Sequence, residues 1–209
     1  MRIRRREFLK SASAAAAAST LPMPAIGQAA YPSKPITLIV PWQASLTADL
    51  MLRGMAEIAS KVLGQSIIVD NKPGASGTLG PATMAGTAKP DGYTIAQLPI
   101  TVFRLPSMQK MSFDPLKDFT YIIHVAGYQF GTVCKADGPI KKWQDAIDMA
   151  KADPNKVTYA TGGVSTSPHI GMELIAAHSG VKFTHVPMKG GSESIAAVLG
   201  GHVLLQAES

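Results

Sequence analysis

The chain is 209 residues long, with 46% hydrophobic and 16% charged residues and a formal net charge of +6. This composition excludes a disordered, highly charged chain and is sufficient for a hydrophobic core. The single cysteine, Cys134, excludes an internal disulfide framework and a cysteine-based zinc cluster. Residues 1–29 hold five basic residues and one acidic residue, a net +4, which leaves +2 for the remainder. That near balance argues against nucleic-acid binding, which needs a basic face.

The first 29 residues have the layout of a secretory signal peptide. A basic start is followed by an alanine-rich run, Ala12–Ile26, and by small residues at Gly27, Ala29 and Ala30. The stretch Arg5–Lys10, Arg-Arg-Glu-Phe-Leu-Lys, resembles the bacterial twin-arginine export signal. We therefore expect residues 1–29 to be a twin-arginine-type signal peptide, cleaved after Ala29 or Ala30. The protein would then be periplasmic.

An amphipathic basic helix lying on a membrane is the alternative for this segment. Pro22 and Pro24 would break such a helix, and the run lacks large apolar residues. The stretch Ser11–Ile26 is also too short and too rich in alanine to predict a membrane span.

The first part of the exported chain alternates strand and helix patterns. Two β-branched runs, Ile36–Val40 and Ser66–Asp70, predict strands, and a third strand is expected at Tyr93–Leu98. Apolar residues recur at helical spacing over Thr47–Val62, and a second helix is expected over Thr78–Ala88. This order predicts a parallel sheet with right-handed crossovers.

A second α/β series follows a less regular stretch, Pro99–Asp118. It is expected to contain strands at 119–125, 130–135, 157–160, 183–186 and 203–206, and helices at 142–152, 166–178 and 192–199. We expect two α/β lobes, at residues 30–100 and 121–209, joined by a crossing segment at 101–120. Ligands bind beyond the carboxyl ends of strands in open α/β sheets, so two such edges would form a cleft. The strand-like surroundings of Cys134 predict a buried, small hydrophobic residue.

The loop Pro41–Asp49 is the first of three polar strand-to-helix loops. It opens a helix whose free backbone N–H groups favour an anion. Ser45 and Thr47 add hydroxyl donors, and Asp49 falls in the first helical turn. The alternative is purely structural: Ser45 or Thr47 caps the helix, and Asp49 stabilises its N-terminus.

The other two loops are Asn71–Gly80 and Tyr159–His169. The glycines of the former are not spaced as G-x-G-x-x-G, and no Walker lysine pattern is present, so a nucleotide site is not expected. The latter combines glycines and hydroxyls before a helix, which suits a second anion cradle. Ser165, Ser167 and His169 also suggest a hydrolase, but a G-x-S-x-G motif is absent. The histidines show no metal-ligand spacing, so neither a metal nor a cofactor is expected.

Eight short motifs are spread along the exported chain. They are Tyr31–Ile36, Ile39–Trp42, Val69–Gly77, Pro90–Thr94, Phe113–Phe119, Tyr159–His169, Val186–Gly190 and Leu199–Val203. In this order they resemble the Bug-type receptors, the periplasmic solute-binding proteins of tripartite tricarboxylate transporters. The resemblance implies an α/β, two-lobed, periplasmic binding protein-like fold (type II-like, Venus-flytrap). It also implies a receptor, not an enzyme, that captures a small organic acid for membrane permease subunits.

The resemblance further implies how the solute is held. Backbone N–H groups, hydroxyls and bridging waters would bind a carboxylate, with the family's aromatic residue falling on Trp42 and its aspartate on Asp49. Ser165 and Thr166 would be the hydroxyl donors of the second lobe. The full set of expected ligand-binding residues is Trp42, Gln43, Ala44, Ser45, Thr47, Asp49, Ser76, Thr161, Gly162, Ser165, Thr166 and His169. We expect Asp49→Ala to weaken binding without changing the fold.

Two departures from the family pattern bear on these expectations. The family's Pro-Gly-Gly is replaced by Ala44-Ser45-Leu46, which restricts positive φ and adds bulk near the ligand. Family chains also continue past the second lobe and return to complete the first sheet, whereas this sequence stops at Ser209. The first lobe is therefore expected to be incomplete, with an open sheet edge. A fragment, a truncated reading frame and completion by a partner are the three explanations.

Two other functions stay open on the sequence alone. An exported hydrolase would use Ser165 or Ser167 with His169 and would turn over its substrate. A ligand-sensing adaptor for a membrane sensor kinase would have the same cleft as a transport receptor, so the residues do not separate these two.

Overall fold

The computed structural model describes residues 30–127 and 129–208. The predicted signal peptide, residues 1–29, lies outside them and stays a prediction. Residues from Lys34 onward form one compact unit, which contains two separate sheets. We name the part with the first sheet, residues 34–119, the first lobe, and the part with the second sheet, residues 131–208, the second lobe.

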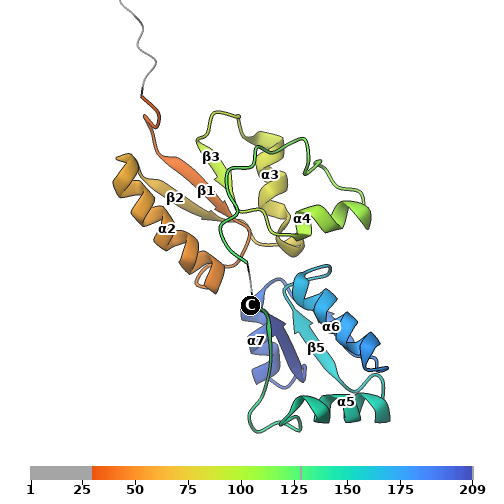
Figure 1. Ribbon diagram of the computed structural model, residues 1–209. Helices are drawn as coiled ribbons and strands as arrows, with labels where there is room; N and C mark the ends of the chain where they lie inside the picture. The colour runs from red at the N-terminus through yellow and green to blue at the C-terminus, as the bar shows by residue number, and fades with distance from the viewer. Residues whose placement is uncertain (1–29, 128, 209) are drawn as a thin grey trace, which may run out of the picture. The chain divides into compact units, whose positions relative to one another are not determined.

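The first lobe contains a three-stranded parallel sheet in the order β2-β1-β3 (Figure 1). Its strands are β1 (Ile36–Val40), β2 (Ile67–Asn71) and β3 (Thr94–Ala96). Ile36 pairs with Ile67 on one side of β1, and Thr37 pairs with Thr94 on the other. Because all three strands run in the same direction, their carboxyl ends meet at one edge of the sheet, as the strand-helix alternation predicts.

Two helices cover the faces of this sheet. Helix α2 (Thr47–Leu63) buries Leu52 and Ala56 against Leu38 and Val40 of β1. Ile39 points to the opposite face and lies against α3 (Leu79–Thr87). Side chains alternate between the two faces of a strand, so the continuous apolar run in β1 serves both helices. The short helix η1 (Ala75–Gly77) precedes α3.

The segment after β3 packs on the first lobe before the chain moves on. It contains α4 (Thr101–Arg104) and η2 (Leu105–Ser107). Val102, Phe113 and Phe119 form a buried cluster with residues of α3. The two phenylalanine rings meet edge to face, with centroids 5.5 Å apart. Hydrophobic burial therefore holds residues 101–119 to the first lobe.

The strand predicted at residues 119–125 is wrong. Ile122 and Ile123 are 78% and 77% exposed, and residues 120–127 have no regular secondary structure. The apolar run there is typical of a strand, but a strand also needs a neighbouring strand to complete its hydrogen bonds. This stretch pairs with no strand in the part of the chain that the structure describes.

The second lobe contains a mixed four-stranded sheet in the order β4-β7-β5-β6. Its strands are β4 (Gly131–Cys134), β5 (Thr158–Thr161), β6 (Thr184–Pro187) and β7 (Leu205–Glu208). β5 runs parallel to β6 and β7, whereas β4 is antiparallel to β7. β4 forms an edge of the sheet, and all four of its residues are exposed. Cys134 is therefore exposed, and the prediction that it is buried is wrong.

Three helices complete the second lobe (Figure 1). α5 (Trp143–Ala152) and α6 (Ser167–His178) pack on one face, around Tyr159 and Leu205. α7 (Gly191–Leu199) packs on the other face, against Ala160. The helices predicted in this lobe are confirmed to within one residue at either end. Among the described helices, none combines the length and the apolar composition that a membrane span requires.

Gly54 offers a test of the helical assignment of α2. It is exposed within the helix, and a Cβ added there would meet no other atom within 4 Å. Glycine loses more backbone freedom than alanine on folding, so we expect Gly54→Ala to raise the free energy of unfolding by about 0.5–1 kcal/mol. Urea denaturation of both proteins measures this, and a lower stability of the variant would contradict the helical environment.

Candidate functional site

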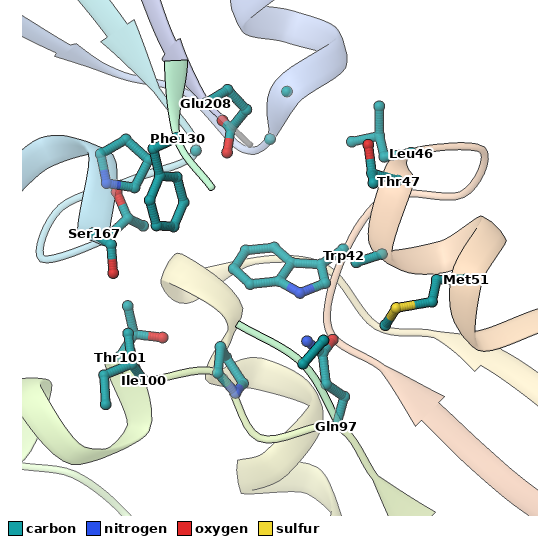
Figure 2. A pocket seen from close by; sticks show the side chains of 18 of the residues that line it. Trp42, Leu46, Thr47, Met51, Gln97, Ile100, Thr101, Phe130, Ser167 and Glu208 are labelled. Carbon is teal, nitrogen blue, oxygen red and sulfur yellow. The ribbon is translucent and has the colours of Figure 1, made fainter. Parts of the chain in front are cut away.

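The carboxyl ends of strands from both sheets open onto one cavity of about 1370 Å³. From the first lobe, the loop after β1, the start of α2 and the residues after β3 line it. From the second lobe, the loop after β5, the starts of α6 and α7 and the end of β7 line it. Figure 2 shows Trp42 of the first lobe and Glu208 and Ser167 of the second among the residues around this space. This is the location expected for a ligand site in open α/β sheets.

Trp42 and Gln43 contribute polar atoms that the protein leaves unsatisfied. The indole Nε1 of Trp42 and the side-chain oxygen Oε1 of Gln43 are both buried, and neither forms a hydrogen bond with another described residue. The Trp42 ring itself is supported from behind, since it packs on the core of the first lobe and against Gly77. Gly77 has φ +85°, and a Cβ there would lie 2.9 Å from the ring. A buried donor or acceptor without a partner is costly, so the Trp42 N–H and the Gln43 oxygen indicate a ligand.

The buried side chain of Asp49 stabilises the loop after β1 through hydrogen bonds. Its side chain is 1% exposed, and its carboxylate accepts hydrogen bonds from the Ser45 N–H at 2.8 Å, Asn71 Nδ2 at 2.7 Å and Arg53 Nε at 2.9 Å. Burial acts to raise its pKa, but these three hydrogen bonds outweigh burial and hold the pKa below its usual value. Asn71 also donates to the carbonyl oxygen of Trp42 at 3.1 Å. Asp49 is thereby linked to Trp42, which lines the cavity.

Ser45 adopts a left-handed backbone conformation, with φ +67°. The replacement of glycine in this loop was expected to restrict positive φ, yet the chain adopts it with serine. The hydrogen bond from the Ser45 N–H to Asp49 compensates the cost of this conformation. Helix α2 begins at Thr47 with Leu46 as its N-cap residue, and no side chain forms a capping hydrogen bond. The predicted capping by Ser45 or Thr47 is therefore wrong.

The loop after β5 is tied down by its own hydroxyl groups. Thr166 Oγ1 donates to the carbonyl oxygen of Gly163 at 2.8 Å, and Thr161 Oγ1 donates to the same oxygen at 3.0 Å. Ser165 is buried with φ +63°, and its N–H donates to Nδ1 of His169 at 3.1 Å. The loop therefore has a defined shape before any ligand arrives.

A stack of three rings supports this loop from below. The ring of His185 stacks between those of Tyr159 and His169. Its centroid lies 4.9 Å from the Tyr159 centroid and 4.0 Å from the His169 centroid. Tyr159 donates from its hydroxyl to Glu173 at 2.6 Å, and His185 Nε2 lies 2.8 Å from Thr161 Oγ1. Burial, and then the neighbouring His169, lower the pKa of His185 to about 4. Burial also lowers the pKa of His169, with Glu173 opposing it.

These pKa shifts predict that acid destabilises the second lobe. Both histidines have folded-state pKa values below the unfolded value of about 6.5, so the unfolded chain binds more protons between pH 6.5 and about 4. Stability is therefore complete above pH 6.5 and falls as the pH is lowered through this window. We expect a loss of about 1–2 kcal/mol between pH 7.5 and pH 5, a value reduced for partial solvent screening.

Urea denaturation at the two pH values measures this loss. His185→Gln removes the most strongly shifted group, so its stability should depend less on pH than that of the unaltered protein. His178→Gln, at the exposed end of α6, is the matched control. Equal pH dependence in all three proteins would contradict the role of the ring stack.

The structure divides the predicted binding residues into two groups. Those that line the cavity are Trp42, Gln43, Thr47, Gly162 and Thr166. Those that do not line it are Ala44, Ser45, Asp49, Ser76, Thr161, Ser165 and His169. Several of the second group shape the two loops, as Asp49 and His169 do. A binding role for the set as a whole stays a prediction.

Other lining residues were not among the predicted binding residues. They include Leu46, Met51, Gln97, Thr101, Ser167 and Glu208, all labelled in Figure 2. Gln97 directly follows β3, so its position after a parallel strand was a signal that could have found it. Glu208 lies at the end of a strand whose partner, β4, comes from a distant part of the chain, and no local motif marks it.

The geometry of the second-lobe loop bears on the hydrolase alternative. The hydroxyl of Ser165 points to the sulfur of Met108, and that of Ser167 accepts from Arg104 Nη1 at 3.0 Å. The Nδ1 atom of His169 accepts a hydrogen bond from the backbone N–H of Ser165. Within the described residues, neither serine forms the hydrogen bond to His169 that an activated nucleophile needs. No group of three His, Cys, Asp or Glu side chains in residues 30–127 and 129–208 is placed to hold a metal ion.

Comparison with known proteins agrees with this architecture. A relative from Cupriavidus necator, described as "UPF0065 protein in gbd 5'region", is 48% identical over 211 residues, which is 99% of this chain and 64% of that protein. A solved structure described as "Structure of a periplasmic transporter" matches with a TM-score of 0.77 and 30% identity, over 85% of this chain and 60% of its own. A second, described as "R. palustris Rpa4515 with adipate", matches with a TM-score of 0.76 and 28% identity, over 84% of this chain and 59% of its own.

These matches confirm the predicted two-lobed, periplasmic binding protein-like α/β fold. This chain spans less than two thirds of the length of these relatives. The family described as "Tripartite tricarboxylate transporter family receptor" matches residues 51–208, which is most of the chain. The chain therefore belongs to the tripartite tricarboxylate transporter receptor family.

Proposed function

We propose that this protein is the solute-binding receptor of a tripartite tricarboxylate transporter, and that it captures a small carboxylate-bearing solute. The observation that carries the proposal is the indole N–H of Trp42, which is buried and has no partner among the described residues. It lies beside a cavity that the start of α6 also lines. Family membership and the adipate named for one structural relative support it. The receptor would present its solute to the membrane permease subunits of the transporter.

The lining residues supply the means to bind a carboxylate. Trp42 Nε1 would donate one hydrogen bond to the solute, and the hydroxyls of Thr166 and Ser167 lie at the start of α6. Free backbone N–H groups and the helix dipole at that position favour a negative charge. The protein would bind and release its solute unchanged, and no cofactor is part of the proposal. The solute would favour a closed conformation of the two lobes if it contacts both of them only in that conformation.

A periplasmic location is part of this proposal. One structural relative is described as a periplasmic transporter, and residues 1–29 carry the predicted twin-arginine export signal. Edman sequencing of protein exported by the host should begin after Ala29 or Ala30, and protein that begins at Met1 would contradict export by this route.

The two tryptophans of the chain permit a direct binding test. Trp42 lines the cavity, whereas Trp143 lies on α5 and packs against Phe183. In the Trp143→Phe variant of this 209-residue chain, Trp42 is the single tryptophan and reports on the cavity. We expect adipate to change its fluorescence saturably, with one equivalent bound and no product formed. A flat titration with adipate, succinate and malate would overturn the proposal, and so would turnover of any of them.

Trp42→Phe tests the indole N–H itself, because it keeps most of the ring and removes the donor. We expect this variant to bind adipate about 5- to 20-fold more weakly, the effect of losing one hydrogen bond to a charged group. Isothermal titration calorimetry of the full-length protein measures the difference. Trp143→Phe is the matched control and should bind as the unaltered protein does; equal affinities in all three would contradict a role for the indole N–H.

A further inference from the structure

The loop after β5 contacts the first lobe at a place outside the cavity. Arg104, the last residue of α4, donates from Nη1 to Ser167 Oγ at 3.0 Å and to the carbonyl oxygen of Ser165 at 3.5 Å. The Ser165 hydroxyl donates in turn to the sulfur of Met108. Neither Arg104 nor Met108 lines the cavity. These contacts therefore join the two lobes through groups of the protein itself.

Helix α4 is anchored to the first lobe on both sides of the Arg104 side chain. Val102 and Leu105 are buried, with exposed fractions of 0% and 5%. At the start of the helix, Thr101 Oγ1 donates to the carbonyl oxygen of Ser76 at 2.7 Å. The guanidinium group therefore reaches the second lobe from a backbone that the first lobe holds in place.

The guanidinium group of Arg104 has no carboxylate partner in the part of the chain that the structure describes. None of the Asp and Glu side chains in residues 30–127 and 129–208 lies within ion-pair distance of it. Its hydrogen bonds go instead to neutral oxygens of the second lobe. A charged donor forms a stronger hydrogen bond than a neutral one, so this contact contributes to holding the lobes together.

The loop that receives Arg104 has a shape of its own. The Ser165 N–H donates to His169 Nδ1 at 3.1 Å, and Thr166 Oγ1 donates to the carbonyl oxygen of Gly163 at 2.8 Å. Because both sides of the contact are ordered beforehand, little conformational entropy is lost when they meet. The contact requires that the lobes are together, and it uses no group of a solute.

We propose that Arg104 is a latch between the lobes, which stabilises the closed conformation and thereby sets the affinity of the receptor without contacting the solute. This inference rests on the proposed receptor function. While the open conformation predominates, the apparent affinity for a solute is proportional to the fraction of protein that is closed. Removal of the latch lowers that fraction by one factor, whatever solute is bound.

Arg104→Met tests the latch, because methionine keeps an apolar stem and removes every donor. We expect this variant to bind adipate and malate about 5- to 20-fold more weakly, the effect of losing a hydrogen bond from a charged group. The factor should be the same for both probes within about threefold. Calorimetry on this 209-residue chain measures the affinities. Lys110→Met removes the same charge from an exposed position nearby and is the matched control, with both affinities unchanged.

The stability of the solute-free protein distinguishes a latch from a residue that the fold requires. The latch joins the lobes and belongs to the core of neither, so Arg104→Met should leave the midpoint of urea denaturation unchanged. A lower midpoint that accounts for the loss of affinity would assign Arg104 to the fold and overturn the latch. Arg104→Lys keeps a charged donor and should recover part of the affinity.

The outcomes separate the latch from the receptor function. Equal affinities of Arg104→Met and the unaltered protein would overturn the latch alone. A loss that differs between adipate and malate by more than about threefold would also overturn it, since Arg104 would then contact the solute. No binding of adipate, succinate or malate to the unaltered chain would overturn the receptor function, and the latch with it.

Discussion

Replacing Asp49 with alanine is expected to lower the free energy of unfolding by about 2–4 kcal/mol and to weaken solute binding at least tenfold. The substitution removes a buried carboxylate that accepts hydrogen bonds from the Ser45 N–H, Arg53 and Asn71. The Ser45 N–H and the Asn71 amide then lose their acceptor in a partly buried place, and such losses cost more than the bonds themselves contribute. Arg53 is half exposed and turns to water, which limits the total.

The binding loss is indirect, since Asp49 does not line the cavity. Without the carboxylate, Ser45 has nothing to hold its positive φ, and Asn71 is freed from its position beside the Trp42 carbonyl. We therefore expect the substitution to lower both stability and affinity, whereas the prediction from the sequence named weaker binding with an unchanged fold.

Chemical denaturation and calorimetry on the same samples measure both effects. Asp49→Asn keeps one oxygen acceptor and should recover part of the stability. Asp70→Ala, which removes a partly exposed ion pair with Lys72, is the control and should change stability by less than about 1 kcal/mol. An Asp49→Ala protein that is fully stable but no longer binds would show instead that Asp49 contacts the solute.

Gly163→Ala is expected to weaken binding at least tenfold, with a loss of stability of about 1–3 kcal/mol. Gly163 has φ +133°, a conformation that alanine rarely adopts. A Cβ there would also lie 3.2 Å from the Cβ and 3.3 Å from the Cα of Ser76, and closer still to the Ser76 hydroxyl. The added methyl group therefore strains its own loop and presses on the first lobe.

A second substitution separates these two causes. Ser76→Gly removes the side chain that the methyl group meets and places glycine at φ +55°, which glycine adopts readily. In the Ser76→Gly background, Gly163→Ala should cost less affinity, while the strain at φ +133° remains. Gly171→Ala, within α6 and without a neighbouring atom within 4 Å of the new Cβ, should leave binding unchanged. Equal affinity of Gly163→Ala and the unaltered protein would contradict the close approach of the two loops.

Local sequence patterns were sufficient for most of the fold. The alternation of β-branched runs and helical spacings placed β1, α2 and α6 within a residue of their observed bounds, because each is set by local propensity and a buried face. The failures lie where long-range contacts decide. Residues 119–125 were predicted as a strand but pair with no strand among the described residues, and Cys134 was predicted as buried but lies on an edge strand. Neither the missing partner strand nor the edge position of Cys134 can be predicted from local sequence patterns.

The residues of the candidate site also fall into those that local sequence patterns predicted and those that depend on long-range contacts. Trp42 and Thr166 follow directly from their position after parallel strands, and the structure places both at the cavity. The supporting contacts could not be predicted, since the ring stack joins residues from β5, α6 and β6. Glu208 faces the cavity because of the register of β7 with β4, whose residues are far away in sequence. Spacing along the chain carries no information about such pairings.

The separation between residues that face the cavity and residues that brace its loops has a practical consequence for engineering. Asp49, Thr161 and His169 brace the loops from behind, whereas Trp42, Gln97 and Glu208 form the wall. A mutant library restricted to wall positions would therefore sample new specificities on an intact scaffold. Such a scaffold, with a native tryptophan as its optical reporter, is a starting point for a family of reagentless biosensors.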